Sequence, residues 1–166
     1  LWQECDRMLA DMAAGRSGVI RGFLPYTPEG IELPNGMLIK YNGLRSSDDG
    51  YQYIANAREF RKLAKRLVAG TEEKINWTNI YGGKVVENIV QALARIVVSE
   101  QATAISEAGY PVKLQVHDEN VCVPVQADVK LAQQVMERVM STPPAWAPDL
   151  PVACESAVGD NYGECK

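Results

Sequence analysis

The chain has 166 residues, of which 46% are apolar and 23% charged, a length and composition that fit one globular domain or a large part of one. The formal net charge of −4 excludes binding of a polyanion through bulk charge, although basic faces on single elements are compatible with it. The cysteines form no C-x-x-C pair, which argues against a zinc site, and we expect them to be reduced thiols in a cytosol: Cys5, Cys122, Cys154 and Cys165. The sequence shows no signal peptide and no apolar run of membrane-spanning length.

The first residue is Leu rather than Met, and a helical pattern follows at once, so we expect a piece of a longer chain. Residues 2–14 predict an amphipathic helix that ends at Gly15. Its apolar positions recur at helical spacing: Trp2, Cys5, Met8, Leu9 and Met12.

Residues 31–41 predict a hairpin, because apolar positions alternate on both sides of Pro34-Asn35-Gly36 and Asn-Gly is a strong turn signal. The polar residues 45–50, with the sequence RSSDDG, predict a loop. A short strand is expected at residues 51–54.

Residues 56–69 predict a helix with Asn56 as its N-cap and Gly70 as its end. Basic side chains recur along one stripe of this helix: Arg58, Arg61, Lys62, Lys65 and Arg66. Two interpretations stay open, a solvated surface helix and a face that neutralises nucleic-acid phosphates.

Residues 84–108 carry the longest periodic apolar pattern and predict a largely buried helix that ends at Gly109. A hairpin at 114–125, a helix at 127–140 and a final strand at 151–158 are expected after it. This order predicts an α+β fold, an antiparallel sheet with helices packed on one face.

The hairpin at 114–125 is predicted to bury Leu114 and Val116 against Val121, Val123 and Val125, with His117–Asn120 as its turn. Asp118 and Glu119 place two like charges side by side at this turn. A solvated turn explains them, since Asp, Glu and Asn favour turns. A bound Mg²⁺ also explains them, because that ion takes one or two protein carboxylates and completes its shell with water and phosphate oxygens.

The sequence GGKVVENIVQALAR at 82–95, followed by GYPVKLQVHDE at 109–119, resembles the C-terminal palm of family A, DNA polymerase I-type, DNA polymerases, in their phage-like branch. VHDE matches motif C of that family, and residues 143–156 resemble the tail of its phage-like members. The resemblance implies a partial fingers-like region at 1–80 with a hairpin and a basic helix, and a palm with the motif C hairpin at 81–166. A bacterial cytosol or a phage-infected host is the expected location.

The resemblance also implies roles for single residues. Asp118 matches the aspartate that binds the catalytic metals, and Glu119 matches its acidic neighbour, which supports the metal site. His117 matches the residue that touches the terminal backbone of the primer. Gln91 matches the glutamine that reads minor-groove acceptors, which are nearly the same for all correct base pairs. Arg95 and Asn88 are further candidate DNA contacts, although the family often places the asparagine one position earlier.

The implied activity is template-directed nucleotidyl transfer by a DNA-directed DNA polymerase, with primer–template DNA and a deoxynucleoside triphosphate as substrates. Two Mg²⁺ ions are the implied cofactors, with Mn²⁺ as an alternative. The sequence contains no match to the motif A aspartate or the motif B lysine of the family. We therefore expect the chain alone to be inactive, and an uncovered apolar surface could give it a non-native dimer.

Two other function classes stay open. One is a non-enzymatic nucleic-acid-binding domain that works through the basic stripe. The other is a metal-dependent nuclease whose site would combine Asp118 and Glu119 with Glu155 or Asp160. The polymerase and the nuclease both require Asp118 for activity, whereas the binding domain does not.

Overall fold

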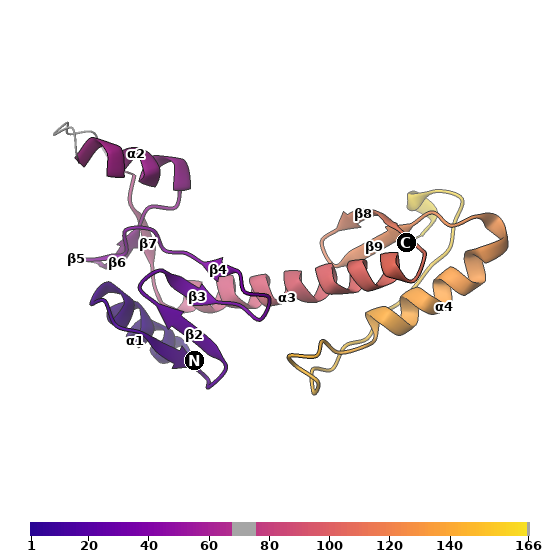
Figure 1. The fold of residues 1–166 in the computed structure, drawn as a ribbon, viewed down its shortest axis with the longest axis horizontal. Coiled ribbons are helices and arrows are strands. Elements are labelled where there is room, and N and C mark those ends of the chain that lie inside the picture. The colour runs from indigo at the N-terminus through magenta and orange to yellow at the C-terminus, as the bar shows by residue number, and fades with distance from the viewer. Residues whose placement is uncertain (68–75, 166) are drawn as a thin grey trace. The chain divides into compact units, whose positions relative to one another are not determined.

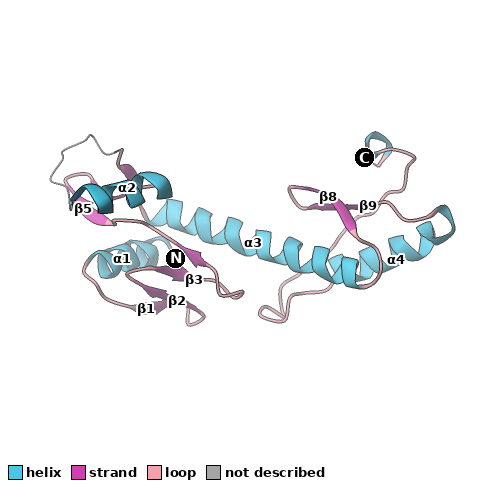
Figure 2. Ribbon diagram, turned by 45° about the horizontal axis from the view of Figure 1, so that its top comes forward, coloured by secondary structure: helices cyan, strands magenta, loops and turns pink. Residues whose placement is uncertain are grey.

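The computed structural model describes residues 1–67 and 76–165, with the side chains of residues 1–63 and 76–165. Four α-helices and nine strands lie in this part of the chain, and every paired strand is antiparallel (Figures 1 and 2), which confirms the predicted α+β class. The chain divides into two compact units, Leu1–Leu93 and Ala94–Lys166. The division into fingers-like and palm regions after residue 80 stays a prediction.

The first unit begins with α1 (Trp2–Ala13), which confirms the first predicted helix. Its core side chains are buried: Cys5, Met8, Leu9 and Met12. Trp2 was expected in the same stripe but is 67% exposed. Trp2 contributes its backbone carbonyl to the packing instead, because that oxygen lies against Gly82.

A four-stranded meander follows, in the order β1 (Gly18–Ile20), β2 (Leu24–Thr27), β3 (Gly30–Glu32) and β4 (Leu38–Ile39). The predicted hairpin is confirmed, since Ile31 pairs with Ile39 across the β3–β4 register. Gly36 has a φ of 78° in its turn, a conformation that favours glycine. Strands β1 and β2 were not predicted.

The second sheet has the order β5 (Arg45–Ser47), β6 (Gly50–Tyr53) and β7 (Thr78–Ile80). The loop prediction for residues 45–50 is therefore wrong: Asp48 and Asp49 form the turn of a hairpin in which Ser47 pairs with Gly50. These strands contain many polar residues because one face of the hairpin lies in solvent. Composition alone therefore predicts a loop for them. The other face carries Tyr51 and Tyr53, which pack against the core.

Helix α2 (Ala57–Leu67) confirms the predicted basic helix. Asn56 caps it, because its Oδ1 accepts hydrogen bonds from the backbone N–H groups of Arg58 at 2.9 Å and Glu59 at 3.2 Å. The predicted end at Gly70 lies outside the described residues.

Helix α3 (Gly82–Glu107) is the longest element and runs from the first unit into the second. Val85 and Ile89 complete the core of the first unit, and Ile96 and Ile105 are buried in the second. The predicted apolar face is interrupted at Val90, which is 57% exposed. Gly109 ends the helix with a φ of 97°, as its position after the periodic segment predicts.

The second unit continues with β8 (Val112–Val116), β9 (Glu119–Cys122) and α4 (Val129–Met140), and the short 3₁₀ helices η1 (Gln126–Asp128) and η2 (Tyr162–Glu164). The predicted strand at 151–158 is wrong. This segment lies along α4 instead, where Gln133 Nε2 donates to Ser156 Oγ at 2.8 Å and Cys154 Sγ contacts Ser141 Oγ at 3.4 Å. These side-chain contacts replace sheet pairing.

Candidate functional site

The hairpin of β8 and β9, here called the acidic hairpin, has a turn of two residues. Val116 pairs with Glu119, so the turn consists of His117 and Asp118 alone, and Glu119 and Asn120 belong to β9. The prediction of a four-residue turn is wrong for this reason. His117 has a φ of 51°, and a positive φ at the first turn position is what a two-residue hairpin with native strand twist uses.

The two carboxylates of the hairpin have different surroundings. Asp118 is exposed at the turn and makes no hydrogen bond or ion pair with the residues that the structure describes. Glu119 is exposed too, but its Oε2 accepts a hydrogen bond from the hydroxyl of Tyr162, which η2 supplies. This hydrogen bond, together with the negative charge of Glu119, holds the pKa of the Tyr162 phenol above its usual value.

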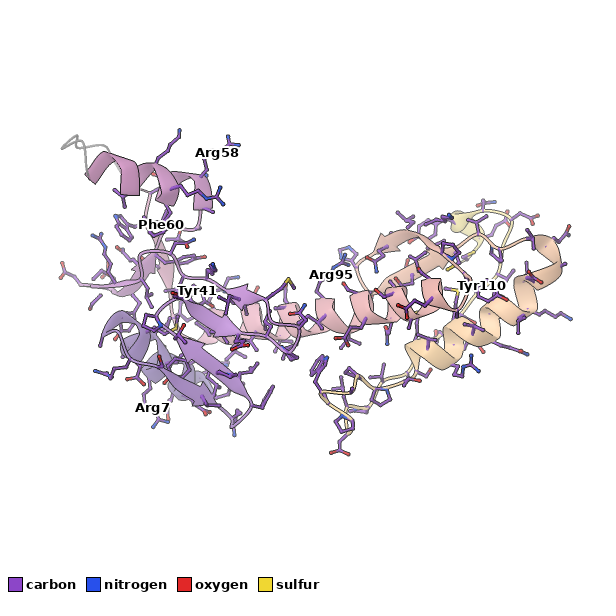
Figure 3. The ribbon with its side chains drawn as sticks, in the orientation of Figure 1. Arg7, Tyr41, Arg58, Phe60, Arg95 and Tyr110 are labelled. Atoms are coloured by element: carbon purple, nitrogen blue, oxygen red, sulfur yellow. The ribbon has the colours of Figure 1, made fainter. Side chains whose placement is uncertain are left out.

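A polar network holds the other side of the hairpin. Arg95 Nη2 donates to Gln115 Oε1 at 2.9 Å, and Gln115 Nε2 donates across the strand pair to Asn120 Oδ1 at 2.9 Å. Asn120 is buried, and its Nδ2 lies 3.9 Å from the sulfur of Met140 in α4. Arg95, predicted as a contact to DNA backbone, is therefore also a structural link between α3 and the hairpin (Figure 3).

The apolar face predicted for the hairpin is formed only in part, because Val116 and Val121 are half-buried while the other three side chains are exposed. Leu114 is 46% exposed, Val123 is 75% exposed and Val125 is 68% exposed. The buried side chain of β9 is the polar Asn120, which contacts Gln115 on β8 and Met140 in α4. Leu131 of α4 is 54% exposed as well, and the dimer of the isolated chain stays a prediction.

Two candidate DNA contacts lie on the part of α3 that belongs to the first unit. Gln91 is exposed. Asn88 is half-buried, and its Nδ2 donates to the hydroxyl of Tyr41 at 3.1 Å. Burial raises the pKa of Tyr41 to about 12, partly offset by this hydrogen bond. The amide donor of Asn88 is thus directed at the protein core.

The basic face of α2 is exposed at Arg58, Arg61 and Lys62, while Phe60 on the other side is half-buried (Figure 3). Phe60 packs beside Gly43 and Ile54: a Cβ at Gly43 would lie 3.5 Å from the Phe60 ring and 3.6 Å from Ile54 Cδ1. The side chain of Lys65, also predicted to bind DNA, lies outside the described residues. The helix therefore has an apolar inner face and a cationic outer face.

Two features escaped the sequence analysis. Tyr162 lies 43 residues after Glu119, and no local pattern links them. Arg45 stacks on the ring of Trp77, with its guanidinium carbon 3.5 Å from the ring centroid. A basic residue and a tryptophan in separate polar segments give no signal until the β5–β6–β7 sheet brings them together.

The carboxylates that could hold a metal ion are few. Among residues 1–67 and 76–165, no three His, Cys, Asp or Glu side chains gather closely enough to form a metal site. Glu155 and Asp160, the extra ligands of the nuclease hypothesis, are exposed. What the hairpin offers is one unengaged carboxylate at Asp118 beside a second, hydrogen-bonded one, which fits a cation that takes most of its ligands from water and substrate.

Within the described part of the chain, no helix is both long enough and apolar enough to cross a membrane.

The chain is similar to a protein described as DNA polymerase from Bacillus phage SP02, with 39% identity over 134 residues. The match covers 80% of this chain and 19% of that protein, so the chain spans about a fifth of the length of this relative. No protein-family model matches the chain. No solved structure matches it either.

Proposed function

We propose that this chain is the C-terminal fingers and palm part of a family A DNA-directed DNA polymerase and carries the motif C hairpin of its active site. The similarity to a phage DNA polymerase over 80% of the chain is the observation that carries this proposal. The two-residue turn that presents Asp118 supports it, because a stiff hairpin tip suits a metal ligand.

In this proposal Asp118 is the metal ligand and Glu119 supports the same site. When bound, Mg²⁺ or Mn²⁺ ions supply the positive charge that activates the primer 3′ hydroxyl and stabilises the in-line displacement of pyrophosphate. The chain offers two adjacent carboxylates, which fits a site that needs a further aspartate from another segment. His117, whose backbone the turn fixes, would contact the terminal phosphate of the primer.

Gln91 and Arg95 lie one turn apart on α3, and we assign both to the primer–template duplex. Gln91 is exposed and its amide can donate to the acceptors that all base pairs share in the minor groove. Arg95 uses one nitrogen for Gln115, and a guanidinium has further donors for a phosphate. The substrates are primer–template DNA and a deoxynucleoside triphosphate.

Primer extension by the complete natural polypeptide that carries this chain tests the proposal. Asp118→Ala should abolish extension, whereas Asp149→Ala, at an exposed loop position of the same unit, should leave it unchanged. The chain of 166 residues by itself should not extend a primer. Extension that survives Asp118→Ala would refute the catalytic assignment.

The exposed cations of α2 favour a second candidate, a non-enzymatic nucleic-acid-binding domain. In that case Asp118→Ala would leave DNA affinity unchanged or raise it, because removing a carboxylate removes repulsion from phosphates. The complete polypeptide would then bind primer–template DNA but show no metal-dependent extension.

A further inference from the structure

The C-terminal tail carries a side chain that contacts the acidic hairpin. Tyr162 is the first residue of η2, is half-buried, and donates its hydroxyl hydrogen to Oε2 of Glu119. Glu119 is the first residue of β9 and follows Asp118 directly. The tail therefore reaches the carboxylate next to the turn, from a position 43 residues away in the chain.

The tail segment has a hydrogen-bond network that fixes how Tyr162 is presented. Asn161 caps η2, since its Oδ1 accepts from the backbone N–H of Gly163 at 3.1 Å, while its Nδ2 donates to Glu164 Oε1 at 2.5 Å. The other oxygen of Glu164 accepts from the backbone N–H of Asp160 at 2.9 Å. One carboxylate thus closes both ends of the short turn around the tyrosine.

Close packing inside this turn supports the same conclusion. A Cβ at Gly159 would lie 2.6 Å from the Cβ of Glu164, which is closer than two such atoms approach. The residue before Asp160 must therefore be small for Glu164 to reach its partners. Residues 159–164 therefore form a tightly packed turn that presents Tyr162.

The hairpin is held on its opposite side by the network that joins Arg95, Gln115 and Asn120. Asn120 follows Glu119 on β9, and its side chain is buried against α4. This network fixes β9 at Asn120, but the turn and the exposed side chain of Glu119 lie beyond it. Tyr162 is what restrains that side chain.

We propose that Tyr162 is a positioning residue, which orients the carboxylate of Glu119 beside Asp118 for the metal and primer chemistry of the hairpin. This inference rests on the proposed function. A neutral phenol suits the task, because it orients a carboxylate without cancelling the negative charge that attracts a cation. Hydrogen-bond partners that orient metal-site carboxylates are typically worth about 10-fold to 100-fold in metal affinity or activity.

The test uses the complete natural polypeptide and the variant Tyr162→Phe, which removes only the hydroxyl. Tyr110→Phe, in the turn between α3 and β8 (Figure 3), is the matched control. Mn²⁺ added alone, and followed by electron paramagnetic resonance, is expected to bind Tyr162→Phe about 10-fold more weakly than the unchanged protein. Tyr110→Phe is expected to bind Mn²⁺ normally, and equal affinity in all three proteins would overturn the inference.

Single-turnover kinetics separate positioning from general damage. Tyr162→Phe should lower the rate constant of nucleotide addition and leave the dissociation constant of the incoming nucleotide within about twofold, since the hydroxyl that is removed donates to Glu119 and the proposal gives it no contact with the nucleotide. In the background of Glu119→Ala, the same tyrosine substitution should have no further effect. Additive effects of the two substitutions would show that Tyr162 does not act through Glu119.

Amide hydrogen exchange of residues 117–122 gives a readout that does not depend on polymerase activity. Tyr162→Phe should speed exchange in this segment, while the melting temperature stays unchanged. Unaltered exchange would overturn the positioning role. A third outcome separates this inference from the proposed function. If exchange becomes faster in Tyr162→Phe but primer extension survives Asp118→Ala, the proposed function is refuted and the contact of Tyr162 with Glu119 is structural.

Discussion

Asp6 in α1 and Gly82 at the start of α3 form a hydrogen bond across 76 residues, in which Gly82 N donates to Asp6 Oδ1 at 2.6 Å. The first N–H groups of a helix lack partners within it, and a carboxylate there is also favoured by the helix dipole. Asp6 therefore fixes where α3 begins against the core of the first unit, and with it the path of the helix that carries Asn88 and Gln91.

Gly82 is expected to tolerate no side chain. A Cβ there would overlap the carbonyl oxygen of Trp2 and lie 2.7 Å from Asp6 Oδ1, and the carbonyl is backbone that cannot move aside. We expect Gly82→Ala to lower the free energy of unfolding by about 1–3 kcal/mol, measured by urea denaturation.

Gly83→Ala is the matched control for that measurement. A Cβ at Gly83 would meet only the ring of Tyr81 at 3.0 Å, and Tyr81 is an exposed side chain that can turn away. Alanine also favours helix over glycine by about 1 kcal/mol, so this variant should be neutral or stabilising. Equal destabilisation by both substitutions would contradict the close approach at Gly82.

The raised pKa of Tyr41 predicts that the free energy of unfolding falls at alkaline pH. Its pKa is raised by burial from the usual 10.0 to about 12, so between these values the unfolded chain releases the phenolic proton while the folded chain keeps it. The unfolded state then binds fewer protons, and the stability present below pH 10 is lost as the pH rises toward 12. Tyr41→Phe should flatten this part of the stability–pH curve, measured by denaturation at several pH values. A curve of unchanged slope would show that other groups govern the loss.

The cationic face of α2 is expected to contact phosphates. Replacing Arg58, Arg61 and Lys62 by Ala should weaken DNA binding and reduce the slope of log affinity against log salt by about 0.9 for each phosphate that is no longer neutralised. Fluorescence anisotropy with primer–template DNA, between roughly 50 and 200 mM salt, measures both quantities. Arg7→Ala, at an exposed position of α1, is the control and should change neither. An unchanged slope in the triple variant would favour the solvated-helix interpretation.

The sequence predicts an element correctly where interactions within a few residues determine it. Asn56 caps α2 and the Asn35-Gly36 turn joins β3 to β4, because both depend on hydrogen bonds and dihedral preferences within a few residues. The strand expected at 51–54 is present as β6, but the polar strand β5 was missed, because its residues favour a loop and only pairing with β6 makes them a strand. The strand predicted at 151–158 is wrong for a different reason. Its apolar pattern is present, but the segment contacts side chains of α4 and does not pair with a strand.

The candidate site shows the same limit. A turn around Asp118 could be predicted from the polar block between apolar arms, but its length could not, because one pair of backbone partners decides whether Glu119 belongs to the turn or to β9. The roles of Asn88 and Tyr162 also depend on distant partners, Tyr41 and Glu119. Family resemblance assigns residues to a site, whereas only tertiary structure shows which of them are already engaged.

Gln91 and Asn88 lie three positions apart on α3 and are expected to respond differently to the same substitution. Gln91→Ala removes an exposed amide, so the free energy of unfolding should change by less than about 0.5 kcal/mol while primer extension by the complete polypeptide falls. Asn88→Ala removes the donor to the hydroxyl of Tyr41, a residue only 3% exposed, and should cost about 1–3 kcal/mol of stability.

Thermal or urea denaturation and primer extension, performed on both variants, separate the two roles. In the background of Tyr41→Phe, Asn88→Ala should lower the free energy of unfolding by less than in the unchanged protein. The reason is that Tyr41→Phe has already removed the buried hydroxyl to which Asn88 donates. If Asn88→Ala lowers primer extension but leaves the free energy of unfolding unchanged, Asn88 is instead a DNA contact. Loss of stability on Gln91→Ala would show that this side chain serves the fold, since an exposed amide that reads DNA contributes nothing to the folded protein alone.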